Sequence, residues 1–201
     1  GLAALLMLPF VAACSSYSSA GGPGQVLKFT AIPNQNTTEL AAKFGPLAQH
    51  LERVLGVEVE YVPTQDYAAS VNLFKTGDVQ LAWFGGLTGV QARAAVPGAH
   101  AIAQGKVDPA FKSYFIANAS LGLARSNEFP LALAGKKFTF GKDSSTSGRL
   151  MPEHFLREST KRSPEEFFGT PNHYSSGHDQ TAELVQAGTF ECGAVDYKVY
   201  E

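Results

Sequence analysis

A hydroxyl-rich turn in the second half of the chain carries the side chains best suited to chemistry. Ser145, Thr146 and Ser147 follow the apolar segment Phe138-Thr139-Phe140, and Gly148 comes directly after them. If a helix begins here, its first N–H groups have no intrahelical partner and its dipole places about half a positive charge at that end. The hydroxyl donors and a close backbone approach at Gly148 suit the turn to an anion. An ordinary helix cap is the alternative, because Ser and Thr are common N-cap residues.

Two further kinds of chemistry are conceivable for the polar residues of this half. Ser147, His178 and Asp196 include the three residue types of a hydrolase triad, but the turn lacks the first glycine of a Gly-x-Ser-x-Gly elbow. His154, His173 and His178 would have to form a metal site, yet their spacing matches no common ligand pattern. The sequence therefore argues against a hydrolase and against a metal site, and we expect no catalysis, no cofactor and no metal.

The elements that must position this turn alternate between strand and helix patterns, as is typical of an α/β protein. Glutamates alternate with apolar residues over 57–61, which favours a strand near a sheet edge. In the first half we expect strands over 26–32, 57–61 and 79–84, and helices capped by Asn36 and Asp66 and spanning 87–95. In the second half we expect strands over 113–117, 136–140 and 190–197, and helices that begin at the hydroxyl-rich turn and at Asp179.

The second half repeats the order of the first. A helix that begins at Asp179, ends at Gly188 and leads into a strand follows the same plan as the segment from Asp66 to the strand over 79–84. We therefore expect two α/β lobes, the first over residues 26–112 and the second over residues 113–201.

The beginning of the chain predicts export and a lipid anchor. A short apolar run over 5–11 leads into Val11-Ala12-Ala13-Cys14, and the stretch 15–24 is rich in Ser and Gly. About ten apolar residues suit a signal peptide and are too few to span a bilayer. We interpret residues 1–25 as a lipoprotein signal and flexible tether with Cys14 as the acylated residue, a buried N-terminal helix being the alternative.

Composition sets the class of partner. The chain is 44% hydrophobic and carries a net charge of -2, so it can form a core and gives no sign of a nucleic-acid partner. Anion binding must then come from local geometry. No second apolar stretch is long enough to cross a membrane, so we expect membrane contact through the lipid alone.

Several motifs, in order along residues 26–201, resemble the phosphate, phosphite and phosphonate substrate-binding proteins of ABC importers. They are Ala31-Ile32-Pro33, Asp66-Tyr67-Ala68-Ala69, Leu81-Ala82-Trp83-Phe84-Gly85-Gly86, Ser145-Thr146-Ser147-Gly148 and Ser176-Gly177-His178-Asp179. The segments 83–87, 138–141 and 147–152 most resemble a branch assigned to selenate binding, with phosphite and phosphonate binders close by.

The resemblance implies a two-lobed, type II-like periplasmic binding protein in which each lobe is a mostly parallel sheet flanked by helices. Such a protein closes on a small oxyanion, delivers it to the permease and ATPase subunits of the importer, works as a monomer and catalyses nothing. An oxyanion sensor that presents its closed form to a histidine kinase is the alternative. We also expect the second lobe to stop before the chain returns to the first lobe.

The resemblance also assigns donors to the anion. The three hydroxyl residues Ser145, Thr146 and Ser147 would hold its oxygens from the second lobe, with His178 as a further donor. Tyr67 would close over it from the first lobe through its hydroxyl. A plain loop cap is the alternative role for His178.

The remaining site residues implied by the resemblance are Trp83, Phe84 and Asp196. Trp83 and Phe84 would wall the cleft, although Phe84 is also suited to the core. Asp196 would lie against the anion, where a carboxylate is repulsive unless the ligand carries a proton to share. A P–OH group meets that condition and selenate does not, so phosphorus oxyanions and selenate both stay open. The alternative is that Asp196 only caps the following turn.

Overall fold

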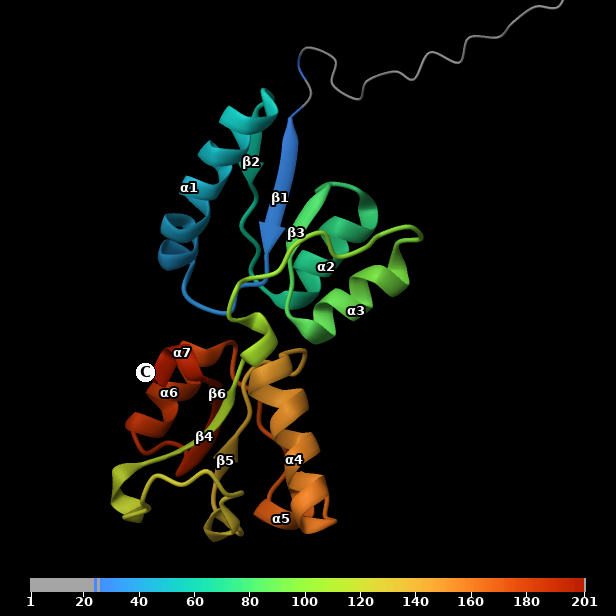
Figure 1. The fold of residues 1–201 in the computed structure, drawn as a ribbon. Helices are drawn as coiled ribbons and strands as arrows, with labels where there is room; N and C mark the ends of the chain where they lie inside the picture. Colours follow the sequence, from blue (N-terminus) through green and yellow to red (C-terminus); the bar gives the residue numbers. More distant parts are fainter. Residues whose placement is uncertain (1–23, 25, 201) are drawn as a thin grey trace, which may run out of the picture.

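The computed structural model describes residue 24 and residues 26–200, so Cys14 and most of the leader lie outside the described residues. The chain forms two α/β lobes, one above the other in Figure 1, joined through the segment 96–112. The predicted two-lobed α/β fold is thus confirmed. Within the described ranges, no helix combines the length and apolar character needed to cross a bilayer.

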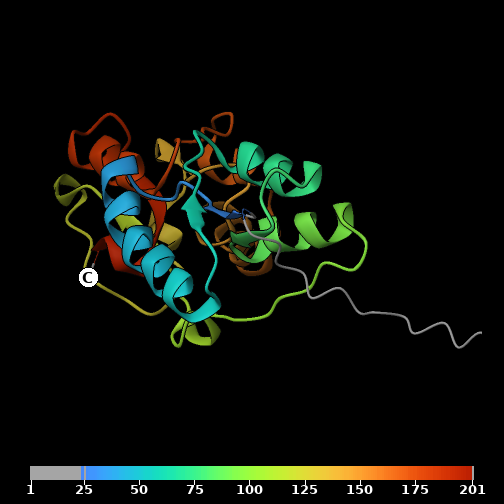
Figure 2. The same cartoon turned by 90° about the horizontal axis from the view of Figure 1, so that it is seen from above.

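Lobe 1 alternates strands and helices. Its elements are β1 (Leu27–Ala31), α1 (Thr37–Leu55), β2 (Val59–Tyr61), α2 (Tyr67–Thr76), β3 (Leu81–Trp83) and α3 (Gly86–Ala95). The sheet has the order β2-β1-β3 and is entirely parallel, so β2 lies at an edge as predicted. Seen from above, α1 covers one side of this sheet and α2 and α3 the other (Figure 2).

Local sequence fixes the ends of the first two helices. The Asn36 side chain accepts a 3.0 Å hydrogen bond from the Glu39 N–H and begins α1, which ends at the left-handed Gly56. In the same way, the Asp66 carboxylate accepts a 2.7 Å bond from the Ala69 N–H and begins α2. Both caps are those predicted from the sequence.

Lobe 2 has a mixed sheet of order β4-β6-β5. Its elements are β4 (Ser113–Ala117), β5 (Phe138–Thr139), a π-helical turn (Thr146–Leu150), α4 (Met151–Thr160), α5 (Pro164–Phe168), α6 (His178–Gln186), β6 (Cys192–Asp196) and α7 (Tyr197–Tyr200). β5 and β6 are parallel as expected, whereas β4 runs antiparallel to β6. The reason is connectivity: the chain enters lobe 2 at Ser113, beside Asp196 at the end facing lobe 1, so β4 can only run away from that end.

The two lobes repeat one plan down to single hydrogen bonds. In lobe 1 the Lys28 N–H donates to the Gln80 side chain at 3.0 Å, and in lobe 2 the Lys137 N–H donates to the Glu191 carboxylate at 2.9 Å. Lys28 lies in β1 and Lys137 directly before β5, while Gln80 and Glu191 are the residues directly before β3 and β6. The predicted repetition is therefore present in the structure.

A second matched pair of contacts lies at the start of α2 and of α6. The hydroxyls of Thr64 and Ser70 lie 2.6 Å apart, and so do those of Ser175 and Thr181. Ser70 also donates to the carbonyl of the residue that caps α2, as Thr181 does in α6. The first residues of α2 and α6 consequently occupy equivalent places in the two lobes.

Candidate functional site

The candidate site lies where the carboxyl ends of the strands of both lobes face each other. In lobe 1 all three strands run toward lobe 2, and in lobe 2 β5 and β6 run toward lobe 1 (Figure 1). Loops and helix N-termini follow the carboxyl ends of parallel strands, which is where α/β folds bind ligands. The topology therefore brings both halves of the predicted site to one interface.

The hydroxyl-rich turn forms a helix N-terminus with an unusual first turn. The Ser145 hydroxyl accepts a 3.0 Å bond from the Gly148 N–H, while the Ser145 carbonyl accepts from the Leu150 N–H at 3.0 Å. The resulting π-helical turn passes directly into α4, whose first turn tolerates Pro152 as predicted. The N–H groups of Thr146 and Ser147 belong to the first turn, where a helix supplies no partners. The predicted cap is present, and we call the turn over 145–148 the seat.

Gly148 permits a close approach of other parts of the protein to the backbone. A Cβ at this position would lie 3.0 Å from Cε1 of His178 and 3.1 Å from both the Cα of Gly141 and the Ser145 hydroxyl. The Gly141 N–H also donates to the Gly148 carbonyl at 2.8 Å. A side chain here would push the helix start away from both Gly141 and His178.

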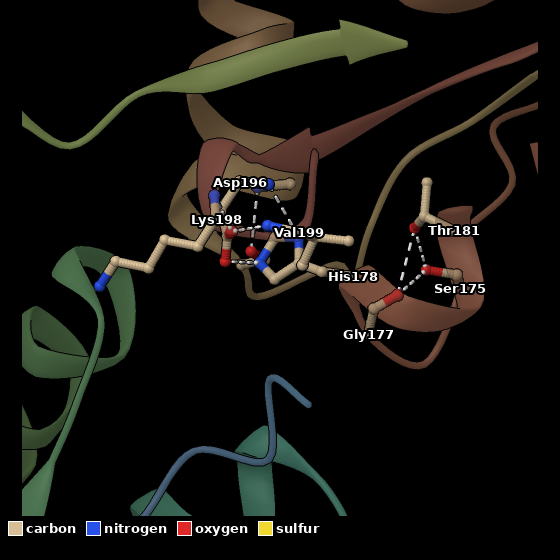
Figure 3. A network of polar contacts seen from close by, with 9 residues as sticks. Ser175, Gly177, His178, Thr181, Asp196, Lys198 and Val199 are labelled. Carbon is tan, nitrogen blue, oxygen red and sulfur yellow. Dashed lines mark hydrogen bonds and ion pairs between the residues drawn. The ribbon is translucent and has the colours of Figure 1, made fainter. Parts of the chain in front are cut away.

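His178 and Asp196 form a buried pair beside the seat (Figure 3). The Asp196 backbone N–H donates to Nδ1 of His178 at 3.2 Å, and Nε2 of His178 lies 3.4 Å from Oδ2 of Asp196. Because Nδ1 accepts, the ring proton is assigned to Nε2. Burial lowers the pKa of His178 below its ordinary value, against the opposing effect of the Asp196 and Asp179 carboxylates. His178 is therefore a neutral N–H donor at pH 7.

Asp196 also caps the short helix α7. Its Oδ1 accepts hydrogen bonds from the backbone N–H groups of Lys198 at 2.9 Å and Val199 at 3.2 Å (Figure 3). The capping alternative is thus part of its role. Its second oxygen is turned to His178, at the end of β6 that faces lobe 1.

Tyr67 is the first residue of α2 and the lobe 1 counterpart of His178. Its side chain is only 1% exposed and lies within hydrogen-bonding reach of Ser145 in lobe 2. Burial raises the pKa of Tyr67 well above its usual range, and the Asp196 charge raises it further. The phenol is therefore a neutral O–H group held between the seat and the buried pair.

Thr146 touches lobe 1 directly. Its hydroxyl oxygen accepts a 2.8 Å hydrogen bond from the Leu87 N–H in the first turn of α3. A Cβ at Gly86 would come within 3.3 Å of the Thr146 side chain, so a larger residue there would make this contact tight. Thr146 retains its own hydroxyl proton to donate elsewhere.

The two aromatic residues predicted as cleft walls pack within lobe 1. Trp83 is 40% exposed and lies beside Phe44 of α1, with ring centroids 6.5 Å apart. Phe84 meets Phe74 of α2 edge-on at 5.7 Å. These ring contacts lie within lobe 1, whereas Tyr67 of lobe 1 contacts Ser145 of lobe 2 and Thr146 of lobe 2 contacts Leu87 of lobe 1.

The prediction that Asp179 caps α6 is wrong. The N-cap of α6 is Gly177, and the Asp179 carboxylate accepts a 3.1 Å hydrogen bond from the Asn36 N–H of lobe 1. A neighbouring pocket of about 340 Å³ opens between the β1–α1 loop and α6. Sequence reasoning missed this contact because its two residues are far apart in the chain.

The geometry also bears on the two other kinds of chemistry. Both ring nitrogens of His178 are turned to Asp196, which leaves neither of them in the position of a base for Ser147. Among residues 24 and 26–200, no three side chains of His, Cys, Asp or Glu gather in a group that could hold a metal ion.

A donor-lined site between two α/β lobes, at the carboxyl ends of their strands, defines a two-lobed binding protein. The sequence model of one protein family, described as the periplasmic substrate-binding protein of the phosphonate ABC transporter, matches residues 29–201. This chain belongs to that family.

Individual relatives agree with this assignment. The chain is 44% identical over 179 residues to a probable ABC transporter phosphite-binding protein of Prochlorococcus marinus, covering 88% of this chain and 60% of the relative. It is 31% identical over 188 residues to a phosphate-import protein of Mycolicibacterium smegmatis, covering 88% and 56%. The chain therefore spans about 60% of the length of these relatives.

Solved structures show the same fold. The structure of PhnD1 from Prochlorococcus marinus in complex with methylphosphonate superposes with a TM-score of 0.82 at 44% identity, covering 87% of this chain and 65% of that one. A phosphonate-transporter binding component from Pseudomonas aeruginosa, 20% identical, superposes with a TM-score of 0.66 over 87% and 58% of the two chains. The second likeness supports the fold alone.

Proposed function

We propose that this chain captures a small tetrahedral phosphorus oxyanion, phosphite or a small alkylphosphonate, between its lobes and delivers it to the permease and ATPase of an ABC importer. One observation carries the proposal: Tyr67 of lobe 1 meets Ser145 at a helix N-terminus of lobe 2, beside the buried pair of His178 and Asp196. Neutral donors from both lobes thus converge on one place.

The donors divide between the lobes. In lobe 2 the first-turn N–H groups and the hydroxyls of Ser145, Thr146 and Ser147 would hold the anion oxygens. The Nε2–H of His178, shared between the ligand and the Asp196 carboxylate 3.4 Å away, would be a further donor. In lobe 1 the Tyr67 hydroxyl would close over the ligand. A ligand bound by both lobes stabilises the closed form by the difference in its affinity for the two forms.

Asp196 would select the ligand. A buried carboxylate beside the seat repels a fully ionised oxyanion and accepts a hydrogen bond from one that keeps a P–OH group. The relatives described as phosphite, phosphate and phosphonate proteins support a phosphorus oxyanion over selenate, and their place in ABC transporters supports import over sensing. Trp83 and Phe84 would form the lobe 1 wall behind these donors.

Calorimetry on the purified protein tests the proposal. We expect phosphite and methylphosphonate to bind, and selenate and sulfate to bind far more weakly. Tyr67→Phe and Ser147→Ala each remove one donor, so each should weaken methylphosphonate binding roughly tenfold, as a hydrogen bond to a charged group does. Unchanged affinity in both variants would place the ligand elsewhere.

A selectivity measurement tests the role of Asp196. Asp196→Asn removes the negative charge and keeps a carbonyl acceptor for the α7 cap. We expect this variant to gain affinity for selenate and sulfate relative to phosphite, because the repulsion is gone. If the order of affinities for phosphite, methylphosphonate, selenate and sulfate is unchanged, Asp196 does not discriminate between ligands.

Lipid anchoring in the periplasm is the second part of the proposal and concerns Cys14. The apolar run before Cys14 and the Ser/Gly-rich stretch after it support an acylated cysteine. Palmitate labelling in a bacterial host should mark the protein and fail with Cys14→Ala. Light scattering of the soluble form should report a monomer.

A further inference from the structure

One interlobe contact lies outside the proposed anion site. The Asn36 N–H, at the N-terminus of the nineteen-residue helix α1, donates a 3.1 Å hydrogen bond to the Asp179 carboxylate of lobe 2. A carboxylate at this end of a helix meets both an unpartnered N–H group and the positive end of the dipole. The contact is therefore a charge-assisted bond between the lobes.

The internal repeat relates this contact to the proposed anion site in lobe 2. Asn36 and Ser145 are equivalent N-caps: each follows the first strand of its repeat, and each side-chain oxygen accepts a 3.0 Å bond from the N–H three residues on, at Glu39 and Gly148. The N-terminus of α1 is thus the lobe 1 counterpart of the anion seat. Each lobe presents such a helix start at the interface.

The start of α6 lies close to the β1–α1 loop beside this bond. A Cβ added to Gly177, the residue that caps α6, would lie 3.4 Å from the Asn34 carbonyl oxygen. A side chain at this position would therefore be in van der Waals contact with the loop of lobe 1. Asp179 is thereby held against the N-terminus of α1 only while the lobes are together.

We propose that Asp179 is a built-in anion that fills the lobe 1 counterpart of the seat and holds the lobes closed. In the closed form each helix start has its own anion: the ligand at α4 and the Asp179 carboxylate at α1. Asp179 is a positioning residue, because it acts on the ligand only through lobe closure. The effect on the ligand rests on the proposed function; the latch between the lobes does not.

Stopped-flow binding of methylphosphonate measures the effect. Asp179→Ala removes the acceptor, so we expect dissociation about tenfold faster, in line with the loss of a charge-assisted hydrogen bond, and an unchanged association rate. Glu183→Gln is the matched control: Glu183 lies one turn further along α6 and lines the same pocket, and the variant removes the same charge. The control should keep the wild-type dissociation rate.

A double-mutant cycle tests the pairing itself. Asn36→Asp keeps a good N-cap for α1 and places a second carboxylate next to Asp179, so like charges should oppose closure. We expect Asn36→Asp to weaken methylphosphonate binding in the wild-type background and to have little effect once Asp179→Ala is present. Equal losses in both backgrounds would overturn the pairing.

Small-angle scattering without ligand separates the latch from the proposed function. Asp179→Ala should enlarge the radius of gyration of the ligand-free protein, whereas Ser147→Ala should not. If methylphosphonate fails to bind at all but scattering still detects the opening, the proposed function fails and the latch stands. If Asp179→Ala alters neither the scattering nor the dissociation rate, the latch is wrong.

Discussion

The Leu87 N–H at the start of α3 in lobe 1 donates a 2.8 Å hydrogen bond to the hydroxyl of Thr146, which begins the π-helical turn that leads into α4 of lobe 2. One hydroxyl therefore joins the N-termini of two helices across the interface. Because Thr146 accepts from lobe 1 and still has a proton to donate, lobe closure and anion binding share this group.

The first prediction concerns that shared hydroxyl. Thr146→Val keeps the size of the side chain and leaves the Leu87 N–H without its acceptor in the closed form. An unsatisfied buried donor costs about 1–3 kcal/mol, so we expect methylphosphonate affinity to fall roughly tenfold or more by calorimetry. Thr146→Ser is the control and should stay close to wild type. A similar loss in both variants would point to the methyl group instead of the hydroxyl.

The second prediction concerns the close approach at Gly148. A Cβ there meets the His178 ring at 3.0 Å and the Gly141 backbone at 3.1 Å, so Gly148→Ala should lower the free energy of unfolding by about 1–3 kcal/mol. Gly45→Ala is the opposite case, since Gly45 lies within α1 and a Cβ there meets nothing within 4 Å. It should raise stability by about 0.5–1 kcal/mol. Urea unfolding of both variants measures whether the free energy of unfolding falls in Gly148→Ala and rises in Gly45→Ala.

The third prediction follows from the buried His178. Its pKa in the folded protein lies below the ordinary 6.5, so on acidification the unfolded chain takes up a proton before the folded chain does. Stability should consequently fall as the pH drops below about 6.5, toward the lowered pKa. Urea unfolding between pH 7 and pH 5 measures the slope, and an NMR titration assigns it to His178. A slope that is unchanged in His178→Gln would assign the effect to other groups.

The fourth prediction uses Trp83, the single tryptophan of the chain. It ends β3, directly before the segment that meets Thr146, and is 40% exposed. If Trp83 walls the cleft, methylphosphonate should shift its emission maximum as the lobes close. If calorimetry shows that the ligand saturates the protein but the emission maximum stays constant, Trp83 does not line the cleft.

Local patterns predicted most of the secondary structure because they act within a few residues. The Asn36 and Asp66 caps each bind an N–H three residues away, and Gly56 ends α1 through its own left-handed backbone. The same locality made the hydroxyl-rich turn at Ser145 recognisable as a helix start. The π-helical first turn was not predicted, since it depends on how Gly148 packs against other parts of lobe 2.

The alternating elements, their caps, the repeated plan and the residue types that can hold an anion all follow from the order of residues along the chain. Which of these groups meet depends on how the two lobes are folded and placed together. The bonds from Leu87 to Thr146 and from Asn36 to Asp179 join residues 59 and 143 positions apart, a separation at which no local pattern acts. Parallel strands in both lobes end at one interface. That arrangement brings Asp179 of lobe 2 into contact with the N-terminus of α1 in lobe 1, and Tyr67 of lobe 1 into contact with the seat in lobe 2.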